Sequence, residues 1–289
     1  MTIPLNYGSQ SMVALLRRVL VRRPDASVAA ADPQRWHYSA RIDIVEAQRE
    51  HDAFVQLLQD SGAEVVFHDE PLPDHADAQF THDPSLVCEQ GAIILKMGKA
   101  LRVGEEDAQA AVFTRRGVPI HARLHGEAQG EGGDMLWLDE RTLLVGIGFR
   151  TNMAAVEQLR AALPGVDVLP FDMPCDMGVA ACLHIMSFIS LLDRDLAVVH
   201  LPLMPVRLFQ LLRSRGVQLV EVPAHEYVTM STNVLAVAPR DCIMLQGNPI
   251  TRARLEAAGC RVRTYKGDEI SLKAEGGATC LTRPIWRSF

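Results

Sequence analysis

The sequence contains one cysteine whose surroundings suit a nucleophile. Cys280 follows a Glu-Gly-Gly-Ala-Thr segment at residues 275–279, and the glycine pair lets the backbone approach a ligand closely while the sulfur stays accessible. A thiol attacks only as the thiolate, so a cationic substrate or a protonated histidine nearby must lower its ordinary pKa of about 8.5. A buried structural thiol is the simpler interpretation of a cysteine, and it suits Cys88, Cys242 and Cys260 better.

Two further segments supply candidates for acid–base chemistry. His184 lies in an apolar segment, Cys-Leu-His-Ile-Met-Ser-Phe at residues 182–188. A lone histidine in such a setting is more often a core residue than a catalyst, unless a carboxylate and a nucleophile lie nearby. Glu131 begins a Glu-Gly-Gly-Asp turn at residues 131–134, which places a carboxylate on either side of two glycines. A surface turn is the simpler interpretation there, so neither segment alone indicates an active site.

Composition and charge exclude several classes of protein. The 289 residues are 48% hydrophobic and 22% charged, a globular balance that argues against wholesale disorder. A net charge of −6 without a Lys/Arg-rich run argues against a nucleic-acid partner. No stretch approaches the roughly 20 apolar residues of a membrane span, and the N-terminus lacks a signal-peptide layout. We therefore expect a cytoplasmic protein with no membrane partner.

The cysteines indicate neither a disulfide framework nor a metal centre. Six cysteines without framework spacing in a chain of this length indicate reduced thiols. Cys175, Cys182 and His184 are a conceivable zinc set, but the sequence has no Cys-x-x-Cys pair, so we expect no metal and no cofactor. The sequence leaves open whether the chain forms a homodimer.

One pattern of elements recurs along the chain: an amphipathic helix, then a glycine, then an apolar strand. Glycine is favoured at the end of a helix because the cap there often needs a left-handed backbone. The five glycines are Gly62, Gly117, Gly165, Gly216 and Gly259, at intervals of 55, 48, 51 and 43 residues. Apolar periodicity predicts the helices at 53–58, 108–116, 153–163, 205–215 and 249–258.

Prolines and an asparagine mark the starts of the last two of these helices. Pro205 and Pro249 suit first helical positions, and Asn248 is the expected cap before Pro249.

Further apolar strands lie between the copies, so each unit should contain several strands and one helix. They are expected at residues 18–21, 85–95, 142–148, 183–192, 196–201, 234–246 and 280–285. Five such units could close into a ring, which would remove the exposed ends of an open stack. A doubly wound α/β sheet fits the pattern equally well, although no Gly-x-Gly-x-x-Gly follows a strand. We expect one α/β domain that covers residues 1–289.

Five short motifs follow one another along the chain from residue 80 onward. They are Phe-Thr-His-Asp-Pro at 80–84, Glu-Gly-Gly-Asp at 131–134, Gly-Ile-Gly-Phe-Arg-Thr-Asn at 146–152, Leu-His-Ile-Met-Ser-Phe-Ile-Ser at 183–190 and Gly-Gly-Ala-Thr-Cys-Leu-Thr at 276–282. In this order they resemble the motifs of the guanidino-group-modifying superfamily, most closely those of dimethylarginine dimethylaminohydrolases. The resemblance covers the chain from about residue 77 to the end and implies the pentein fold, a five-bladed α/β propeller.

The resemblance also implies a catalytic role for three residues. Cys280 would attack the guanidinium carbon of the substrate. His184 would protonate the leaving amine and then deprotonate the water that cleaves the thiouronium intermediate. Glu131 would orient His184.

The same resemblance assigns residues to substrate binding. Asp83 would pair with the guanidinium cation. Arg102 and Arg150 would hold the α-carboxylate of the substrate, because the planar fork of arginine matches a carboxylate. Asp77, just before the motif that contains Asp83, matches an acidic residue that lies at the substrate in the family.

Two positions depart from the patterns of related enzymes. Met186 stands where arginine deiminases and amidinotransferases carry the aspartate of His-x-Asp, which favours the dimethylargininase side. His82 stands where dimethylargininases usually carry glutamate. If His82 faces the site, the adjacent Asp83 should raise its pKa above about 6.5, and substrate binding should weaken at acid pH. Alternatively, His82 points away from the pocket and hydrogen-bonds a neighbouring loop.

The resemblance thus predicts a cysteine-dependent hydrolase of a guanidino compound. The substrate would be arginine or an N-methylated arginine derivative, and the products a ureido compound such as citrulline and an amine or ammonia. The alternative enzymes are an arginine deiminase or dihydrolase, or an amidinotransferase. A non-catalytic pentein that only binds a ligand is the alternative from another class, and the intact set of Cys280, His184 and Glu131 argues against it.

Overall fold

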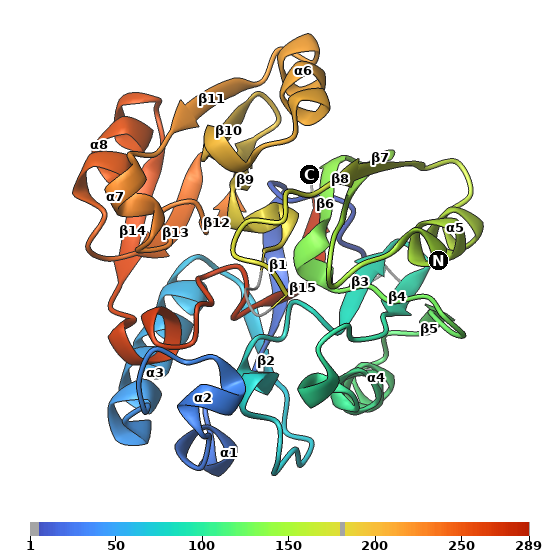
Figure 1. Cartoon of the computed structure of the whole chain (residues 1–289), viewed down its shortest axis with the longest axis vertical. Coiled ribbons are helices and arrows are strands. Elements are labelled where there is room, and N and C mark those ends of the chain that lie inside the picture. Colours follow the sequence, from blue (N-terminus) through green and yellow to red (C-terminus); the bar gives the residue numbers. More distant parts are fainter. Residues whose placement is uncertain (1–5, 180–182, 289) are drawn as a thin grey trace.

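The chain forms five blades around a common axis, as Figure 1 shows. The structure is a computed structural model that describes residues 6–179 and 183–288. Each blade is a three-stranded sheet whose middle strand pairs antiparallel with the inner strand and parallel with the outer one. In the third blade, β7 (Thr142–Ile147) pairs in this way with β6 (Met135–Asp139) and β8 (Asp167–Asp172). The five-bladed α/β ring is thereby confirmed, and the doubly wound sheet is excluded.

The other blades repeat this arrangement along the chain. Their strands, each set given as inner, middle and outer, are β3 (Ser85–Cys88), β4 (Gly91–Ile94) and β5 (Ile120–Arg123); β9 (Ile189–Asp193), β10 (Leu196–Val199) and β11 (Gln218–Glu221); β12 (Leu235–Ala238), β13 (Asp241–Leu245) and β14 (Arg261–Tyr265). The first blade is closed by the two ends of the chain, because β1 (Leu15–Val21) lies between β15 (Arg283–Ser288) and β2 (Glu64–Phe67).

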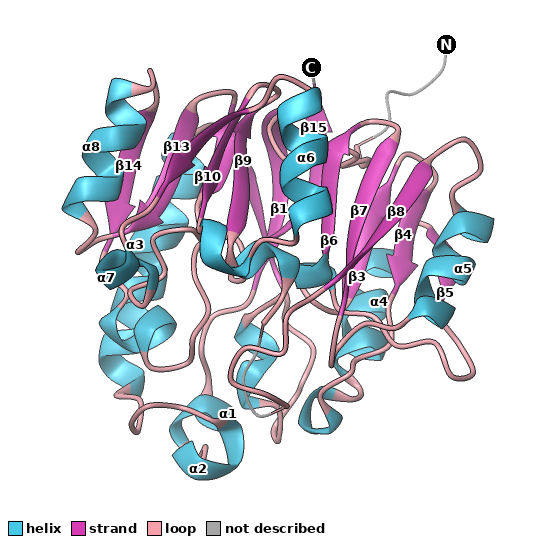
Figure 2. Cartoon of the chain, turned by 45° about the horizontal axis from the view of Figure 1, so that its top comes forward, coloured by secondary structure: helices cyan, strands magenta, loops and turns pink. Residues whose placement is uncertain are grey.

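A helix precedes the outer strand of every blade, as the repeat predicts. These helices are α3 (Ile44–Asp60), α4 (Glu105–Arg115), α5 (Met153–Ala162), α6 (Val206–Ser214) and α8 (Pro249–Ala257). All five repeat glycines have φ between 74° and 88°, the left-handed region that favours glycine. Figure 2 shows α8 and α5 at opposite outer edges of the molecule, with strands between them. The short helices α1 (Ala26–Ala29), α2 (Pro33–Trp36) and α7 (Ala224–Tyr227) complete the set.

The core is divided into five hydrophobic clusters, each between two neighbouring blades. Successive residues of one strand therefore enter different clusters. On β13, Cys242 and Met244 pack toward the fourth blade, whereas Ile243 and Leu245 pack toward the first. Both faces of such a strand are buried, which explains why the strands read as continuous apolar runs rather than as alternating ones.

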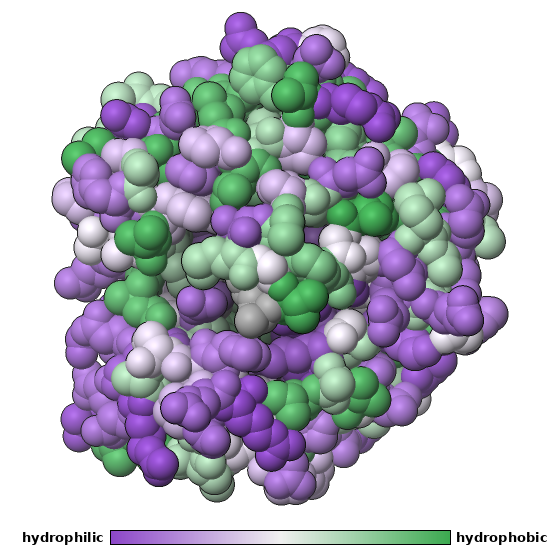
Figure 3. Space-filling model, in the orientation of Figure 1, coloured by the Kyte–Doolittle hydropathy of each residue, from purple (hydrophilic) through white to green (hydrophobic). Residues whose placement is uncertain are grey.

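The surface differs in character from these interfaces. On the face shown in Figure 3, apolar side chains gather near the centre and polar ones dominate the periphery. Among the described residues, no helix combines the length and apolarity needed to cross a bilayer.

Two expected strands begin later than their apolar patterns suggest. The run at 183–192 contributes only β9, because residues 185–187 form a 3-10 turn. The run at 280–285 becomes a strand only at Arg283, since the Leu281 and Thr282 amides donate to the carbonyls of Gly277 and Thr279 and hold Cys280 in a turn. Both candidate catalytic side chains thus lie in loops next to inner strands, where their direction is not set by strand alternation.

The caps of two helices differ from the expectation. Pro205 is the residue before α6 rather than its first residue. Asn248 makes no side-chain cap for α8 and instead accepts a hydrogen bond from Thr229. The buried carboxylate of Glu226 accepts from the amides of Ile250 and Thr251. A carboxylate at that end also suits the helix dipole, and it comes from a distant part of the chain.

Candidate active site

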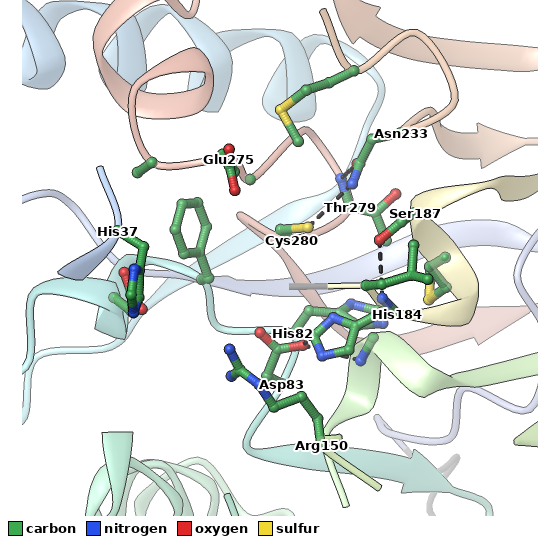
Figure 4. A pocket seen from close by; sticks show the side chains of 18 of the residues that line it. His37, His82, Asp83, Arg150, His184, Ser187, Asn233, Glu275, Thr279 and Cys280 are labelled. Atoms are coloured by element: carbon green, nitrogen blue, oxygen red, sulfur yellow. Dashed lines mark hydrogen bonds and ion pairs between the residues drawn. The ribbon is translucent and has the colours of Figure 1, made fainter. Parts of the chain in front are cut away.

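A cavity of about 450 Å³ collects side chains from the loops between successive blades. Seven of the eight predicted site residues line it, namely Asp77, His82, Asp83, Arg102, Arg150, His184 and Cys280. The eighth, Glu131, is fully buried behind His184. Figure 4 shows the Cys280 side chain on one side of the cavity and the imidazole of His184 with the Asp83 carboxylate on the other. Residues as far apart in the sequence as Asp77 and Cys280 are therefore brought to one site.

His184 is oriented by Glu131. The Nε2 atom of His184 lies 2.9 Å from Oε2 of Glu131, and the other carboxylate oxygen accepts hydrogen bonds from the amides of Gly98 and Lys99. Burial would raise the pKa of Glu131, but the hydrogen bond and charge of His184 outweigh it and hold that pKa below its ordinary value. An ionised Glu131 only accepts, so Nε2 carries the proton of a neutral ring, and Nδ1 lies 4.0 Å from Oδ1 of Asp83.

The loop that carries His184 is fixed by Asp134. One carboxylate oxygen accepts from the Ile185 amide at 3.1 Å and the other from the Thr151 hydroxyl at 2.7 Å. Burial raises the pKa of Asp134 to about 6. Gly133 lies against the His184 ring, and a Cβ atom there would come within 2.2 Å of Nδ1. The second glycine of the turn at 131–134 is thus required by the close approach of the imidazole. Asp134 is a buried neighbour of the His184 loop that was not among the predicted site residues.

Cys280 is half-buried, and its sulfur accepts a hydrogen bond from Asn233. The Asn233 Nδ2 to Cys280 Sγ distance is 3.1 Å. Burial, assisted by the negative charge of Asp83, raises the pKa of the thiol to about 11, although Asn233 and His184 act in the opposite direction. Without a bound ligand, the thiol therefore keeps its proton near neutral pH. A cation that enters the cavity would favour the thiolate.

Asp83 is held by two donors. Its Oδ1 accepts from the Gly133 amide at 3.0 Å, and its Oδ2 lies 2.5 Å from Nη1 of Arg102. Burial opposes ionisation, but Arg102 keeps the pKa of Asp83 well below its ordinary value. Arg102 also donates to Glu105, whose pKa burial raises to about 7, and to the Phe80 carbonyl. Arg102 lines the cavity, but most of its donors are already directed at protein acceptors.

The lining of the cavity includes a second ion pair, between Asp77 and Lys99. Asp77 accepts from the Tyr38 hydroxyl at 2.8 Å and from Lys99 Nζ at 2.6 Å. The Lys99 ammonium also lies over the Trp36 ring, 5.2 Å from its centroid. Arg150 Nη1 lies 3.4 Å from both Glu131 oxygens. Lys99 and Trp36 were not predicted as site residues, because no motif of the sequence includes them.

The site also offers a set of potential metal ligands. Ligand atoms of Asp83, Glu131 and His184 all lie within 4.8 Å of one another. Glu131 and His184 are hydrogen-bonded to each other, and Asp83 is paired with Arg102, so each of the three already has a partner within the protein. Of the conceivable zinc set, Cys182 lies outside the described residues.

His82 differs from the expectation in its protonation. Its ring lines the cavity, yet Nδ1 lies 2.8 Å from the Thr282 carbonyl, so both alternative placements are partly correct. Burial, together with the nearby charge of Arg283, lowers the pKa of His82 to about 3 and outweighs the opposite effect of Asp83. The expectation of a raised pKa was therefore wrong, because it ignored burial. A neutral His82 donates through Nδ1 to the Thr282 carbonyl. Above about pH 4 its ring is uncharged and does not repel a cation.

Removing the titratable ring of His82 should flatten the acid side of the stability curve. Because the folded pKa lies below the unfolded value of about 6.5, this histidine contributes stability that is fully present above that value and is lost as the pH falls toward 3. In His82→Asn the amide nitrogen can still donate to Thr282. Urea unfolding would give the free energy of unfolding at pH 7 and at pH 4. We expect this free energy to fall between the two pH values by on the order of a few kcal/mol less in the variant than in wild type.

Other histidines set the background for this measurement. Burial also lowers the pKa of His51 and His68 to about 4, so the variant should keep a residual slope. Parallel curves for wild type and His82→Asn would show that His82 takes up its proton in the folded state as easily as in the unfolded one.

A family model matches most of the sequence. The model described as N,N dimethylarginine dimethylhydrolase, eukaryotic, matches residues 21–287, which is most of the chain. The matched range includes all eight predicted site residues.

Curated relatives and a solved structure extend the comparison. The chain is 27% identical to an uncharacterized protein of Bacillus subtilis, YkgA, over 94% of this chain and 92% of that one. It is 25% identical to an arginine deiminase of Listeria welshimeri, over 86% of this chain and 69% of that one. The structure of dimethylarginine dimethylaminohydrolase from Pseudomonas aeruginosa, complexed with citrulline, is similar with a TM-score of 0.77 and 21% identity, over 93% of this chain and 98% of that one. The five-bladed ring, the family model and these relatives together lead to one conclusion: the chain belongs to the N,N dimethylarginine dimethylhydrolase family, and it has the pentein fold of the guanidino-group-modifying proteins.

Proposed function

We propose that the protein is a cysteine-dependent hydrolase of arginine or an N-methylated arginine. The observation that carries the proposal is one cavity that holds a thiol, a histidine oriented by a buried carboxylate, and a second carboxylate for a cation. Cys280, His184 and Asp83 come from three different loops and face the same space in Figure 4. Nucleophile, base and orienting group in this relation are the signature of covalent catalysis.

The proposed reaction has two stages. The guanidinium binds beside Asp83, the Cys280 thiol gives its proton to Nδ1 of His184, and the resulting thiolate attacks the central carbon of the guanidinium to form a carbon–sulfur bond. His184 then gives a proton to one nitrogen, the carbon–nitrogen bond breaks, and an amine leaves a thiouronium on the sulfur. His184 next takes a proton from water, the hydroxide attacks the same carbon, and the carbon–sulfur bond breaks. The products are a ureido compound and the free thiolate.

The lining beside His184 favours a substituted nitrogen as the leaving group. Met186, almost fully buried, lies two residues after His184 and lines the cavity where a second carboxylate would otherwise grip the guanidinium. An apolar side chain next to the leaving nitrogen accommodates a methyl group better than a bare NH₂. The alternative substrate is unmethylated arginine, which the relative named arginine deiminase favours.

A panel of guanidino compounds tests this proposal. Wild-type protein would be incubated with arginine, mono- and dimethylarginines and agmatine, and the products identified by mass. We expect citrulline from at least one arginine-type substrate, without any added amine acceptor. Iodoacetamide labelling of Cys280 should be blocked by the same compound. Binding without turnover across the whole panel would favour a non-catalytic ligand-binding pentein, and turnover only with an added amine would favour an amidinotransferase.

Arg150 should distinguish substrates that carry an α-carboxylate from those that lack it. If it contacts that carboxylate, Arg150→Ala removes one partner of a charge pair, a loss of roughly 2–5 kcal/mol. We expect KM for the arginine-type substrate to rise about 30-fold or more, and KM for agmatine, the decarboxylated analogue, to change little. Because Arg150 also lies 3.4 Å from Glu131, kcat should fall for both compounds, and only the ratio of KM values is diagnostic. Equal changes in KM would show that Arg150 does not recognise the carboxylate.

A further inference from the structure

The amide of Asn233 contacts the candidate nucleophile in a fixed orientation. Asn233 precedes β12, is 5% exposed, and comes from a different loop than Cys280. Its Oδ1 accepts from the Thr279 amide at 2.9 Å, and its Nδ2 lies 3.1 Å from the Cys280 sulfur. A backbone N–H only donates, so the oxygen must face Thr279 and the NH₂ must face the sulfur. The contact is therefore a hydrogen bond to sulfur.

The backbone around Asn233 is tied to the segment that carries the histidine. The hydroxyl of Thr232 donates to the Ser187 carbonyl at 2.6 Å, and the hydroxyl of Ser190 donates to the Thr232 carbonyl at 2.7 Å. On its other side Asn233 packs against Gly277, where an added Cβ would come within 2.6 Å of Asn233 Cγ. Asn233 thus contacts the Cys280 loop directly, and its neighbour Thr232 ties the same backbone to the His184 segment.

The charges around the sulfur explain why a neutral donor is useful at this position. Burial and the negative charge of Asp83 act against ionisation of Cys280, and Asn233 and His184 favour it. A lysine or arginine in place of Asn233 would favour the thiolate more strongly, but it would repel a guanidinium substrate. An amide donor stabilises negative charge on sulfur without adding a positive charge to the cavity.

We propose that Asn233 is a positioning residue, whose amide aims the Cys280 sulfur into the cavity and stabilises its thiolate form. The inference rests on the proposed function, because it concerns the nucleophile of that reaction. It adds a fourth side chain to the set formed by Cys280, His184 and Glu131, and it assigns a purpose to the contact between Gly277 and Asn233.

The test measures the Cys280 thiol directly, without substrate. The rate of alkylation by iodoacetamide would be followed against pH and located at Cys280 by peptide mass, with Cys280→Ser as the blank for the other thiols. A hydrogen bond to a charged group corresponds to about one to two pH units, so in Asn233→Ala the midpoint of alkylation should rise by about that amount. At neutral pH kcat/KM should fall about tenfold to a hundredfold, mostly in kcat.

A second variant separates the effect on the thiolate from a loss of structure. Asn233→Asp keeps an oxygen for the Thr279 amide but places a carboxylate oxygen against the sulfur, so its midpoint should rise at least as far as that of Asn233→Ala. The matched control is Asn248→Ala, which removes an equally buried amide that donates to the Thr229 and Leu245 carbonyls. This control should lower the melting temperature and leave the Cys280 midpoint at its wild-type value.

One result would overturn the proposal. If Asn233→Asp, and Asn233→Ala where it folds, alkylate with the wild-type midpoint, the amide does not stabilise the thiolate. That outcome would leave the proposed function intact, since turnover by Cys280→Ser tests the function separately.

Discussion

Replacement of Cys280 by serine is expected to abolish turnover while the substrate still binds. A hydroxyl is a far weaker nucleophile toward a guanidinium carbon than a thiolate, and no other described thiol lines the cavity. Loss of an enzyme's nucleophile typically lowers kcat by about 10⁴-fold or more. Because Asp83 and its partners are unchanged, calorimetric titration should give a dissociation constant close to the wild-type KM.

Cys88, a buried cysteine that does not line the cavity, provides the control for this experiment. The Cys88 thiol donates to the Gly91 carbonyl within β3 and its turn, and a serine hydroxyl can make the same contact. Cys88→Ser should therefore keep kcat at the wild-type value. Equal loss of activity in both variants would point to misfolding, and full activity in Cys280→Ser would refute covalent catalysis at this residue.

The second large effect is expected for Glu131→Gln. The two backbone amides of Gly98 and Lys99 require an acceptor at Oε1, so the glutamine oxygen should occupy that place and its NH₂ should face His184. The imidazole would then accept at Nε2 and carry its proton on Nδ1, the wrong tautomer to take a proton from water. In serine proteases, the corresponding exchange of an orienting aspartate for asparagine lowers kcat about 10⁴-fold, and we expect a loss of about 10³–10⁴-fold here.

Glu226→Gln is the matched control for Glu131→Gln. Glu226 is likewise buried and accepts two backbone amides, but it caps α8, whereas Glu131 binds His184. Its exchange should lower stability without an effect on kcat. In wild type, proton transfer by His184 should make kcat depend on pH. This dependence should be absent from the kcat of Glu131→Gln. A profile of unchanged shape and height would mean that Glu131 does not set the tautomer.

The number of blades was predictable from the sequence, whereas the closure of the ring was not. Each helix ends at a left-handed glycine and is followed by a strand buried on both faces, so the repeat leaves a local signal. The pairing of β15 with β1 joins residues more than 260 positions apart. No local pattern encodes such a pairing. The starts of β9 and β15 were missed for a related reason, because an apolar run does not distinguish a strand from the buried loop that precedes it.

The candidate site divides in the same way. Cys280, His184 and Glu131 lie in glycine-flanked or apolar motifs that the sequence displays. The structure brings Cys280 and His184 to one cavity, with Glu131 buried behind His184. The protonation of His82 was not predictable, because it depends on burial by the segment around Thr282. Asn233 also carries no motif of its own. Its importance is visible only once the loop before β12 lies against the Cys280 turn.

The most direct test of the account is the mass of the Cys280 peptide during turnover. Wild-type protein would be quenched in acid while it consumes the best substrate of the panel, then digested and analysed by mass spectrometry. Covalent catalysis predicts a transient gain on Cys280 equal to the substrate minus the amine released, and its loss once the substrate is exhausted. The account would be contradicted if that adduct formed on another residue, or if protein with Cys280 fully alkylated turned over the substrate at the wild-type rate.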